Sequence, residues 1–124
     1  MTLPALEWIG VKALAFGVGD FERALRFYTV TLGLPLAHED GQPVGVHLGP
    51  TLLLLKADWH APPSALLNPR VTVQTGDARA MEAALRARGV VIADPVAAYG
   101  SALVGSFLDS EGNKLWFCSQ TAAA

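Results

Sequence analysis

The side chains that could carry acid-base or metal chemistry are few in this 124-residue chain. They are three histidines, His38, His47 and His60, and one cysteine, Cys118. His38 shares the strand face of His47 only if Asp40-Gly41 forms a two-residue hairpin. His60 falls in a segment that we expect to be a linker. The histidines therefore do not predict a metal site, and we expect Cys118 to be a small buried apolar residue rather than a nucleophile.

The elements that must position these side chains occur twice in the sequence. Gly19-Asp20 and Gly76-Asp77 each open a stretch with helical apolar spacing, and the stretches end at Gly33 and Gly89. Asp77 follows Asp20 by 57 residues and Gly89 follows Gly33 by 56 (77 − 20 and 89 − 33). The two aspartates are the expected helix caps, because their side chains accept N–H groups of the first helical turn. One strand-like run precedes each helix and three follow it.

We expect an α+β fold in which two βαβββ modules make up a single domain over residues 1–124. The first module spans about 9–56, a linker spans 57–68, and the second module spans about 69–119. The predicted strands cover about 9–16, 34–38, 44–48, 51–56, 70–74, 90–93, 102–107 and 114–119. Two such modules with curved mixed sheets enclose a cleft, so the repeat predicts a ligand cavity.

Two motifs of the chain resemble the vicinal oxygen chelate superfamily. They are Val18–Tyr28, around the start of the first helix, and Phe107–Leu115, around the last turn. This superfamily holds glyoxalase I, extradiol dioxygenases, fosfomycin-resistance enzymes and bleomycin-resistance proteins. The resemblance covers roughly residues 9 to 119 and implies helices on the outer sheet faces, a ligand cavity on the inner faces, and a homodimer. Within the second motif, Asp109–Asn113 is expected to act only as a turn.

The resemblance also locates the positions at which metal-dependent members carry His or Glu ligands. Carried over to this chain, these positions fall on Ala13, near Leu54, on Arg70 (or Val71 if the register slips by one) and on Trp116. Methyl, isobutyl and indole groups offer no suitable lone pair, and a guanidinium repels a cation. The resemblance therefore implies a member without a metal, and we expect no cofactor.

Strand alternation selects the same face as these positions. Bulky apolar residues such as Val71 and Val73 should face the helices, which leaves the alternate positions for the cavity. This set contains Ala13, Ala15, His47, Leu52, Leu54, Arg70, Thr72, Lys114, Trp116 and Cys118. A mostly apolar wall with a few polar groups is typical of a small-molecule site.

The candidate ligand-binding residues are Trp116, His47, Arg70, Thr72, Leu54 and Ala13, with Trp59 in the linker and Tyr99 in a rim loop at the mouth. Trp116 is either a stacking platform or a plug that fills the place of the metal. Arg70 either orients an anion or is a solvated residue at a strand end. His47 either contacts the ligand or is a satisfied interior histidine. No catalytic residue is assigned.

Composition narrows the choice of partners. The net charge of −2 and the 16% share of charged residues provide no basic patch for nucleic acid. No apolar run approaches the roughly 18 residues of a membrane span, and the segment 1–4 does not resemble a signal peptide. We therefore expect a cytoplasmic protein without a nucleic-acid or membrane partner.

The leading hypothesis is a metal-independent small-molecule-binding protein of the bleomycin-resistance type. It would hold a planar or partly apolar ligand in the inner-face cavity of a homodimer, with antibiotic resistance as one implied role. The alternative is a glyoxalase-like lyase or isomerase, or a dioxygenase-type enzyme, acting on a small carbonyl or oxygenated substrate. In a metal-free enzyme, His47 would be the general base and Arg70 would stabilise an oxyanion. A third hypothesis is a scaffold whose cavity is filled by its own side chains.

Overall fold

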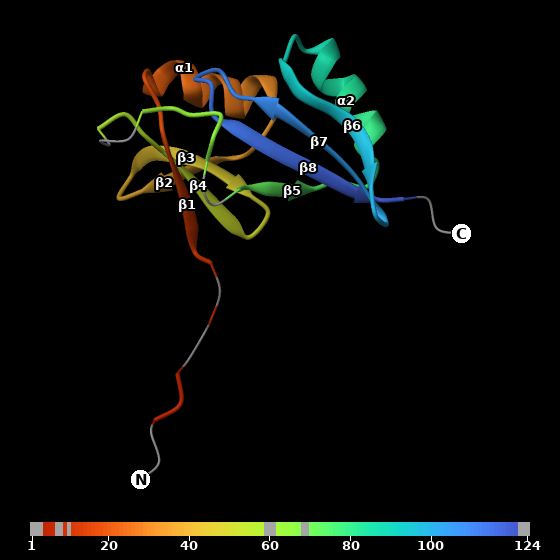
Figure 1. Cartoon of the computed structure of the whole chain (residues 1–124). Coiled ribbons are helices and arrows are strands. Elements are labelled where there is room, and N and C mark those ends of the chain that lie inside the picture. Colours follow the sequence, from red (N-terminus) through yellow and green to blue (C-terminus); the bar gives the residue numbers. More distant parts are fainter. Residues whose placement is uncertain (1–3, 7–8, 10, 59–61, 68–69, 122–124) are drawn as a thin grey trace.

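The computed structural model describes residues 4–6, 9, 11–58, 62–67 and 70–121 (Figure 1). These residues form two four-stranded sheets. The first sheet contains, in spatial order, β1 (Ala13–Gly17), β4 (Thr51–Lys56), β3 (Gln42–Leu48) and β2 (Leu36–Glu39). The second contains β5 (Thr72–Gln74), β8 (Lys114–Gln120), β7 (Ala102–Leu108) and β6 (Ile92–Tyr99).

Both sheets have the same mixed topology. In the first, β1 is parallel to β4, and in the second, β5 is parallel to β8, while the other neighbours are antiparallel. Neither sheet closes on itself, because each has two edge strands. The predicted α+β class and paired βαβββ architecture are therefore confirmed.

Each sheet is accompanied by a helix that begins at the predicted aspartate. The helices are α1 (Phe21–Arg26), which continues as a π-helix η1 (Phe27–Thr31), and α2 (Ala78–Ala87). The Asp20 carboxylate accepts the Arg23 N–H at 3.0 Å, and Asp77 accepts the Ala80 N–H at 3.1 Å. Within the described part of the chain, neither helix has the length and apolarity needed to cross a membrane.

The hairpin between β2 and β3 has the two-residue turn that the sequence predicts. Asp40 and Gly41 both have positive φ, 51° and 77°, as a type I′ turn requires. His38 lies opposite Pro43 beside the turn, and the register shifts at a bulge between Ala37 and His38. The His47 N–H instead bonds to the Pro35 carbonyl at the far end of the hairpin. The two histidines are therefore not cross-strand neighbours.

One hydrophobic core joins the two modules. It includes Tyr28 from the helical segment, Val46 and Leu53 from the first sheet, and Leu115 and Phe117 from the second, all with at most 1% of their surface exposed. Because these strand residues lie on the helix-facing side of each sheet, the other face of each sheet points away from the shared core. This other face is the inner face of the sequence prediction, and we call it the outward face.

The β7–β8 turn holds the modules together, which corrects the expectation that Asp109–Asn113 acts only as a turn. The Glu111 carboxylate accepts the backbone N–H groups of Gly19 and Asp20, each at 3.0 Å. It also accepts two hydrogen bonds from the Arg23 guanidinium, at 2.7 and 2.8 Å. These bonds from Arg23 hold the pKa of Glu111 at about 2, against the opposing effect of burial.

The same turn also contacts the buried residue Tyr28, which lies in η1 directly after α1. The hydroxyl of Tyr28 donates to the Asp109 carboxylate at 2.8 Å, and burial together with this negative charge raises the pKa of Tyr28 well above its ordinary value. The Asn113 amide donates to the Gly17 carbonyl at 2.9 Å, and its oxygen accepts the Ser64 N–H. The turn thus contacts the first strand, the first helix and the linker.

Several strand boundaries differ from the sequence prediction by two residues or more, and three of them bear on the site. The strand β1 begins at Ala13 rather than near residue 9, and β5 begins at Thr72 rather than Arg70. The strand β6 continues past Pro95 to Tyr99, because an edge strand tolerates a residue without an N–H group and two register shifts absorb the irregularity. Tyr99 therefore ends a strand instead of lying in a loop, and 80% of its surface is exposed.

Candidate small-molecule site

A row of side chains crosses the outward face of the second sheet. Thr72 of β5 lies opposite Trp116 of β8, and Trp116 lies opposite Ser106 of β7. The neighbours of Trp116 in sequence, Leu115 and Phe117, are buried in the core, so strand alternation directs the indole to the outward face. The parity prediction for Trp116 and Thr72 therefore matches the register of the strands.

Two cations lie over the Trp116 ring. The Arg70 guanidinium carbon and the Lys114 ammonium nitrogen are each 4.4 Å from its centroid. At this distance the ring quadrupole attracts both charges. Among the described residues, Arg70 makes no ion pair, whereas Lys114 pairs with the Asp94 carboxylate at 2.6 Å. Arg70 is thus the cation at this site with donors to offer a ligand.

Asp94 and Ser106 form the polar side of the site, and sequence reasoning missed both. The Ser106 hydroxyl donates to the Asp94 carboxylate, which also accepts the hydrogen bond from Lys114. These two hydrogen bonds, that of Lys114 foremost, lower the pKa of Asp94. The predicted strand stopped one residue before Asp94, whereas β6 runs from Ile92 to Tyr99 and places Asp94 within the sheet.

A hollow of about 180 Å³ adjoins the indole. Its walls are Ala65, Leu66 and Leu67 from the linker, together with Arg70, Lys114 and Trp116. Trp116 is half-buried, so the indole borders open space instead of being sealed on all sides. Trp59, the other predicted mouth residue, lies outside the described residues, and no contact of Tyr99 with this hollow is observed in the part of the chain that the structure describes.

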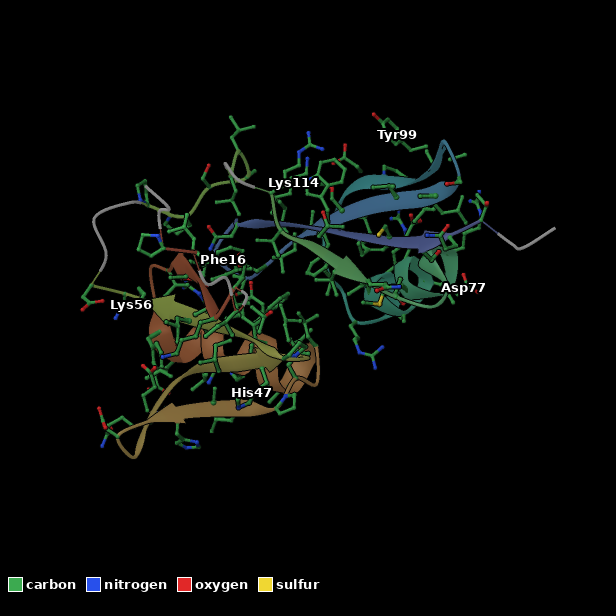
Figure 2. All side chains as sticks on the ribbon, turned by 90° about the horizontal axis from the view of Figure 1, so that it is seen from below. Phe16, His47, Lys56, Asp77, Tyr99 and Lys114 are labelled. Atoms are coloured by element: carbon green, nitrogen blue, oxygen red, sulfur yellow. The ribbon has the colours of Figure 1, made fainter. Side chains whose placement is uncertain are left out.

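The remaining candidates lie on the first sheet. Ala13, Leu52 and His47 are aligned across β1, β4 and β3, and Leu54 lies opposite Ala15. His47 is exposed. Figure 2 shows His47 on the first sheet and Lys114 on the second, well separated in the molecule. One chain therefore does not bring His47 to the cations around Trp116, as a shared cavity would require.

The positions carried over from metal-dependent relatives do not fit a metal. Ala13 and Leu54 have no donor atom, and Arg70 and Trp116 offer only N–H groups, the first of them cationic. The structure as described, with residues 59–61 and 68–69 outside it, shows no group of three His, Cys, Asp or Glu side chains close enough to hold an ion. What these side chains can do is bind an aromatic surface and an acidic or polar group.

Paired βαβββ modules with open mixed sheets define the chain as an α+β protein of the glyoxalase-like fold. The profile of the Glyoxalase/Bleomycin resistance protein/Dioxygenase superfamily matches residues 10–117. The chain belongs to this superfamily, which confirms the resemblance seen in the sequence.

Solved structures of other proteins have the same fold. The antibiotic binding protein TnmS3 from Streptomyces sp. CB03234 is 24% identical, with a TM-score of 0.79 over 94% of this chain and 100% of that one. A superfamily member from Sphaerobacter thermophilus is 22% identical, with a TM-score of 0.74 over 93% and 100%. Lactoylglutathione lyase from Agrobacterium tumefaciens is 19% identical, with a TM-score of 0.68 over 89% and 92%.

Identities this low establish the fold alone, and the three neighbours include both a binding protein and an enzyme. A comparison with curated protein sequences found no match.

Proposed function

We propose that this chain is a metal-independent small-molecule-binding protein of the bleomycin-resistance type. The observation that supports this most is Trp116, half-buried beside a hollow and covered by two cations at one of the positions where metal-dependent relatives hold a ligand. The likeness to an antibiotic binding protein points the same way.

The ligand that this site suits is planar or partly apolar and carries an acidic or polar group. The indole and the linker residues Leu66 and Leu67 supply apolar surface, and Arg70 supplies donors for the polar group. Thr72, beside Trp116 on β5, offers a hydroxyl at the same face. These side chains provide affinity and orientation without a covalent step.

We also propose that the protein works as a homodimer, in which a second copy covers the outward sheet faces. Ala13, Leu52 and Leu54 are half-buried apolar residues on the first sheet, and a partner's sheet would complete the cavity that a single chain leaves open. Analytical ultracentrifugation over a range of concentrations tests this. A concentration-independent monomer of 13.1 kDa would rule it out.

Tryptophan fluorescence tests the binding proposal. With Trp8 and Trp59 replaced by phenylalanine, Trp116 is the one remaining indole, and a library of planar antibiotics and aromatic acids is screened for changes in its emission and in the melting temperature. Trp116→Ala should weaken the best ligand by about 1–3 kcal/mol. Unchanged affinity in this variant would contradict the proposed role.

Metal content provides a separate test. We expect elemental analysis of the purified protein to find no stoichiometric transition metal and chelators to leave the melting temperature unchanged. One equivalent of metal bound at the outward sheet face would overturn the metal-independent assignment.

A further inference from the structure

A second cavity, the helix-side cavity, lies between α2 and the first module. Its volume is about 210 Å³. The first module contributes Leu34 and Leu48 to it, α2 contributes Met81, Ala84 and Leu85, and Arg88 follows directly after α2. Leu115 also lines this cavity and lies on the opposite face of β8 from its neighbour Trp116, so the cavity is separate from the outward-facing site around Trp116.

A difference in turn length explains why the cavity exists. The repeat offset of 57 residues places Leu85 of α2 at the position of Tyr28, which binds the five-residue turn between β7 and β8. The turn between β3 and β4, which follows Leu48, has only two residues, Gly49 and Pro50. A turn this short leaves part of the space beside α2 unfilled.

The interior of the helix-side cavity is apolar. Leu34, Leu48, Met81 and Ala84 are half-buried, and Leu85 is buried. Apolar cavities of about 150 Å³ stay dry and bind benzene, because water finds no hydrogen-bond partner in them. The helix-side cavity therefore has room for a ring of that size.

A charged residue, Arg88, lies at the opening of the cavity to solvent. It is the one lining residue with an exposed side chain, and its guanidinium donates to the Ala84 carbonyl at 3.1 Å. Nearby on α2, Arg86 pairs with Glu82, whereas Arg88 makes no ion pair within the described residues. Its remaining donors are in position to bind a carboxylate at the rim.

We propose that the helix-side cavity is a second ligand site, which takes a small apolar carboxylic acid. The ring or branched chain of the ligand occupies the space beside Met81 and Ala84, and its carboxylate pairs with Arg88. The site is independent of the proposed function at Trp116, and its failure would leave that function untouched.

Methionine labelling provides a direct readout, because the chain has only two methionines, Met1 and Met81. In protein with ¹³C-labelled methionine methyl groups, millimolar benzoate should shift the Met81 signal in a saturable manner. The Met1 signal, if the residue is retained, serves as an internal reference. A Met81 signal that does not respond to benzoate overturns the proposal.

Filling the cavity should abolish this response. Ala84→Leu should weaken benzoate at least tenfold, whereas Ala83→Leu, on the exposed side of the same helix, should leave the affinity unchanged. Ala84→Val is a smaller filling change that keeps the test valid if the leucine variant does not fold. Trp116→Ala should not alter the Met81 response. Loss of binding in the Trp116 variant, or equal binding in both leucine variants, would place benzoate elsewhere.

The charge at the mouth is tested with benzyl alcohol, a neutral ligand of similar shape. Benzoate should bind at least fivefold more tightly than benzyl alcohol. Arg88→Gln should remove this preference, and Arg79→Gln, on an exposed part of α2, should preserve it. Equal binding of the two probes to the unmodified protein would contradict the assignment of a carboxylic acid.

Discussion

The two helices of the repeat start alike but meet different surroundings in the opposite module. An aspartate caps each helix, and the apolar stripe of each faces the shared core. Beside α1, the five-residue turn supplies Asp109, Glu111 and Asn113, which together bind the strand, the helix start and Tyr28. Beside α2, the two-residue turn supplies no such bonds, and a cavity of about 210 Å³ remains.

The length of one turn thus decides how each junction between the modules is formed. The longer turn closes the junction beside α1 with polar contacts, and the shorter turn leaves the junction beside α2 open to a ligand. The polar junction contains several buried groups that satisfy each other, so removing one leaves others without partners. The apolar junction contains no such groups, so it tolerates a void at a smaller cost in stability.

Removing the carboxylate of Asp109 should have the largest effect. Asp109→Ala deprives the Tyr28 hydroxyl and the N–H groups of Glu111 and Asn113 of their acceptor. We expect the free energy of unfolding to fall by about 4 kcal/mol, measured by urea denaturation, because several buried donors lose their partner. Ser101→Ala, an exposed change in the turn between β6 and β7, is the control. A loss below about 1 kcal/mol would show that water replaces these bonds.

Removing only the hydroxyl of Tyr28 should cost less. Tyr28→Phe keeps the ring in the core and deletes one hydrogen bond to a carboxylate, so we expect a loss of about 2 kcal/mol by the same measurement. Tyr99→Phe, at an exposed position, should change stability by less than about 0.5 kcal/mol. Equal effects of the two changes would contradict the role of the Tyr28–Asp109 bond.

The ion pair of Glu111 should give the polar junction a dependence on pH. Its pKa is about 2 in the folded protein and near its ordinary value of 4.5 in the unfolded chain. A lowered pKa stabilises the fold above about pH 4.5, and this stabilisation is lost as the pH falls toward 2. The effect should be modest, because the Arg23 partner is half exposed and solvent screens the pair.

Denaturation curves between pH 5 and pH 2.5 check this dependence. Glu111→Gln, which cannot ionise, should lose less stability over this interval than the unmodified protein. Parallel losses in both proteins would show that other carboxylates govern the acid transition.

Filling the apolar junction should have the smallest effect, and it should be stabilising. Ala84→Leu adds three carbon atoms to the cavity, and we expect a gain of about 1 kcal/mol after the cost of imperfect packing. Ala83→Leu, on the exposed face, should change stability by only a few tenths of a kcal/mol. Thermal unfolding by circular dichroism measures both. A destabilised Ala84→Leu variant would show that the cavity is too narrow for the added side chain.

The helices and the hairpin could be predicted because their signals are local, whereas the order of elements in each module followed from the repeat. Asp20 and Asp77 cap helices within three residues of themselves, and Asp40-Gly41 sets its turn from its own backbone preferences. The face of β8 that points away from the core could be predicted from the sequence, because Trp116 alternates with the apolar residues Leu115 and Phe117. The same logic missed Asp94, because the predicted strand ended at residue 93 and the bulges of β6 carry no sequence signature.

The arrangement of the two modules could not be predicted in this way. Nothing near Glu111 in the sequence identifies Gly19 and Asp20 as its partners, and alternation cannot show that His47 and Trp116 lie on separate sheets facing away from one core. The ligand-binding roles of all the candidate residues stay predictions: Trp116, His47, Arg70, Thr72, Leu54, Ala13, Trp59 and Tyr99.

Glu111 binds backbone groups that lie far from it in the sequence. The amides of Gly19 and Asp20 precede it by 92 and 91 residues. A chain that grows from its N-terminus completes β1 and α1 long before it contains their acceptors. The N-terminal half therefore cannot complete this junction before the turn between β7 and β8 has been synthesised. We expect the duplicated halves, although each resembles a small domain, to acquire their final structure together.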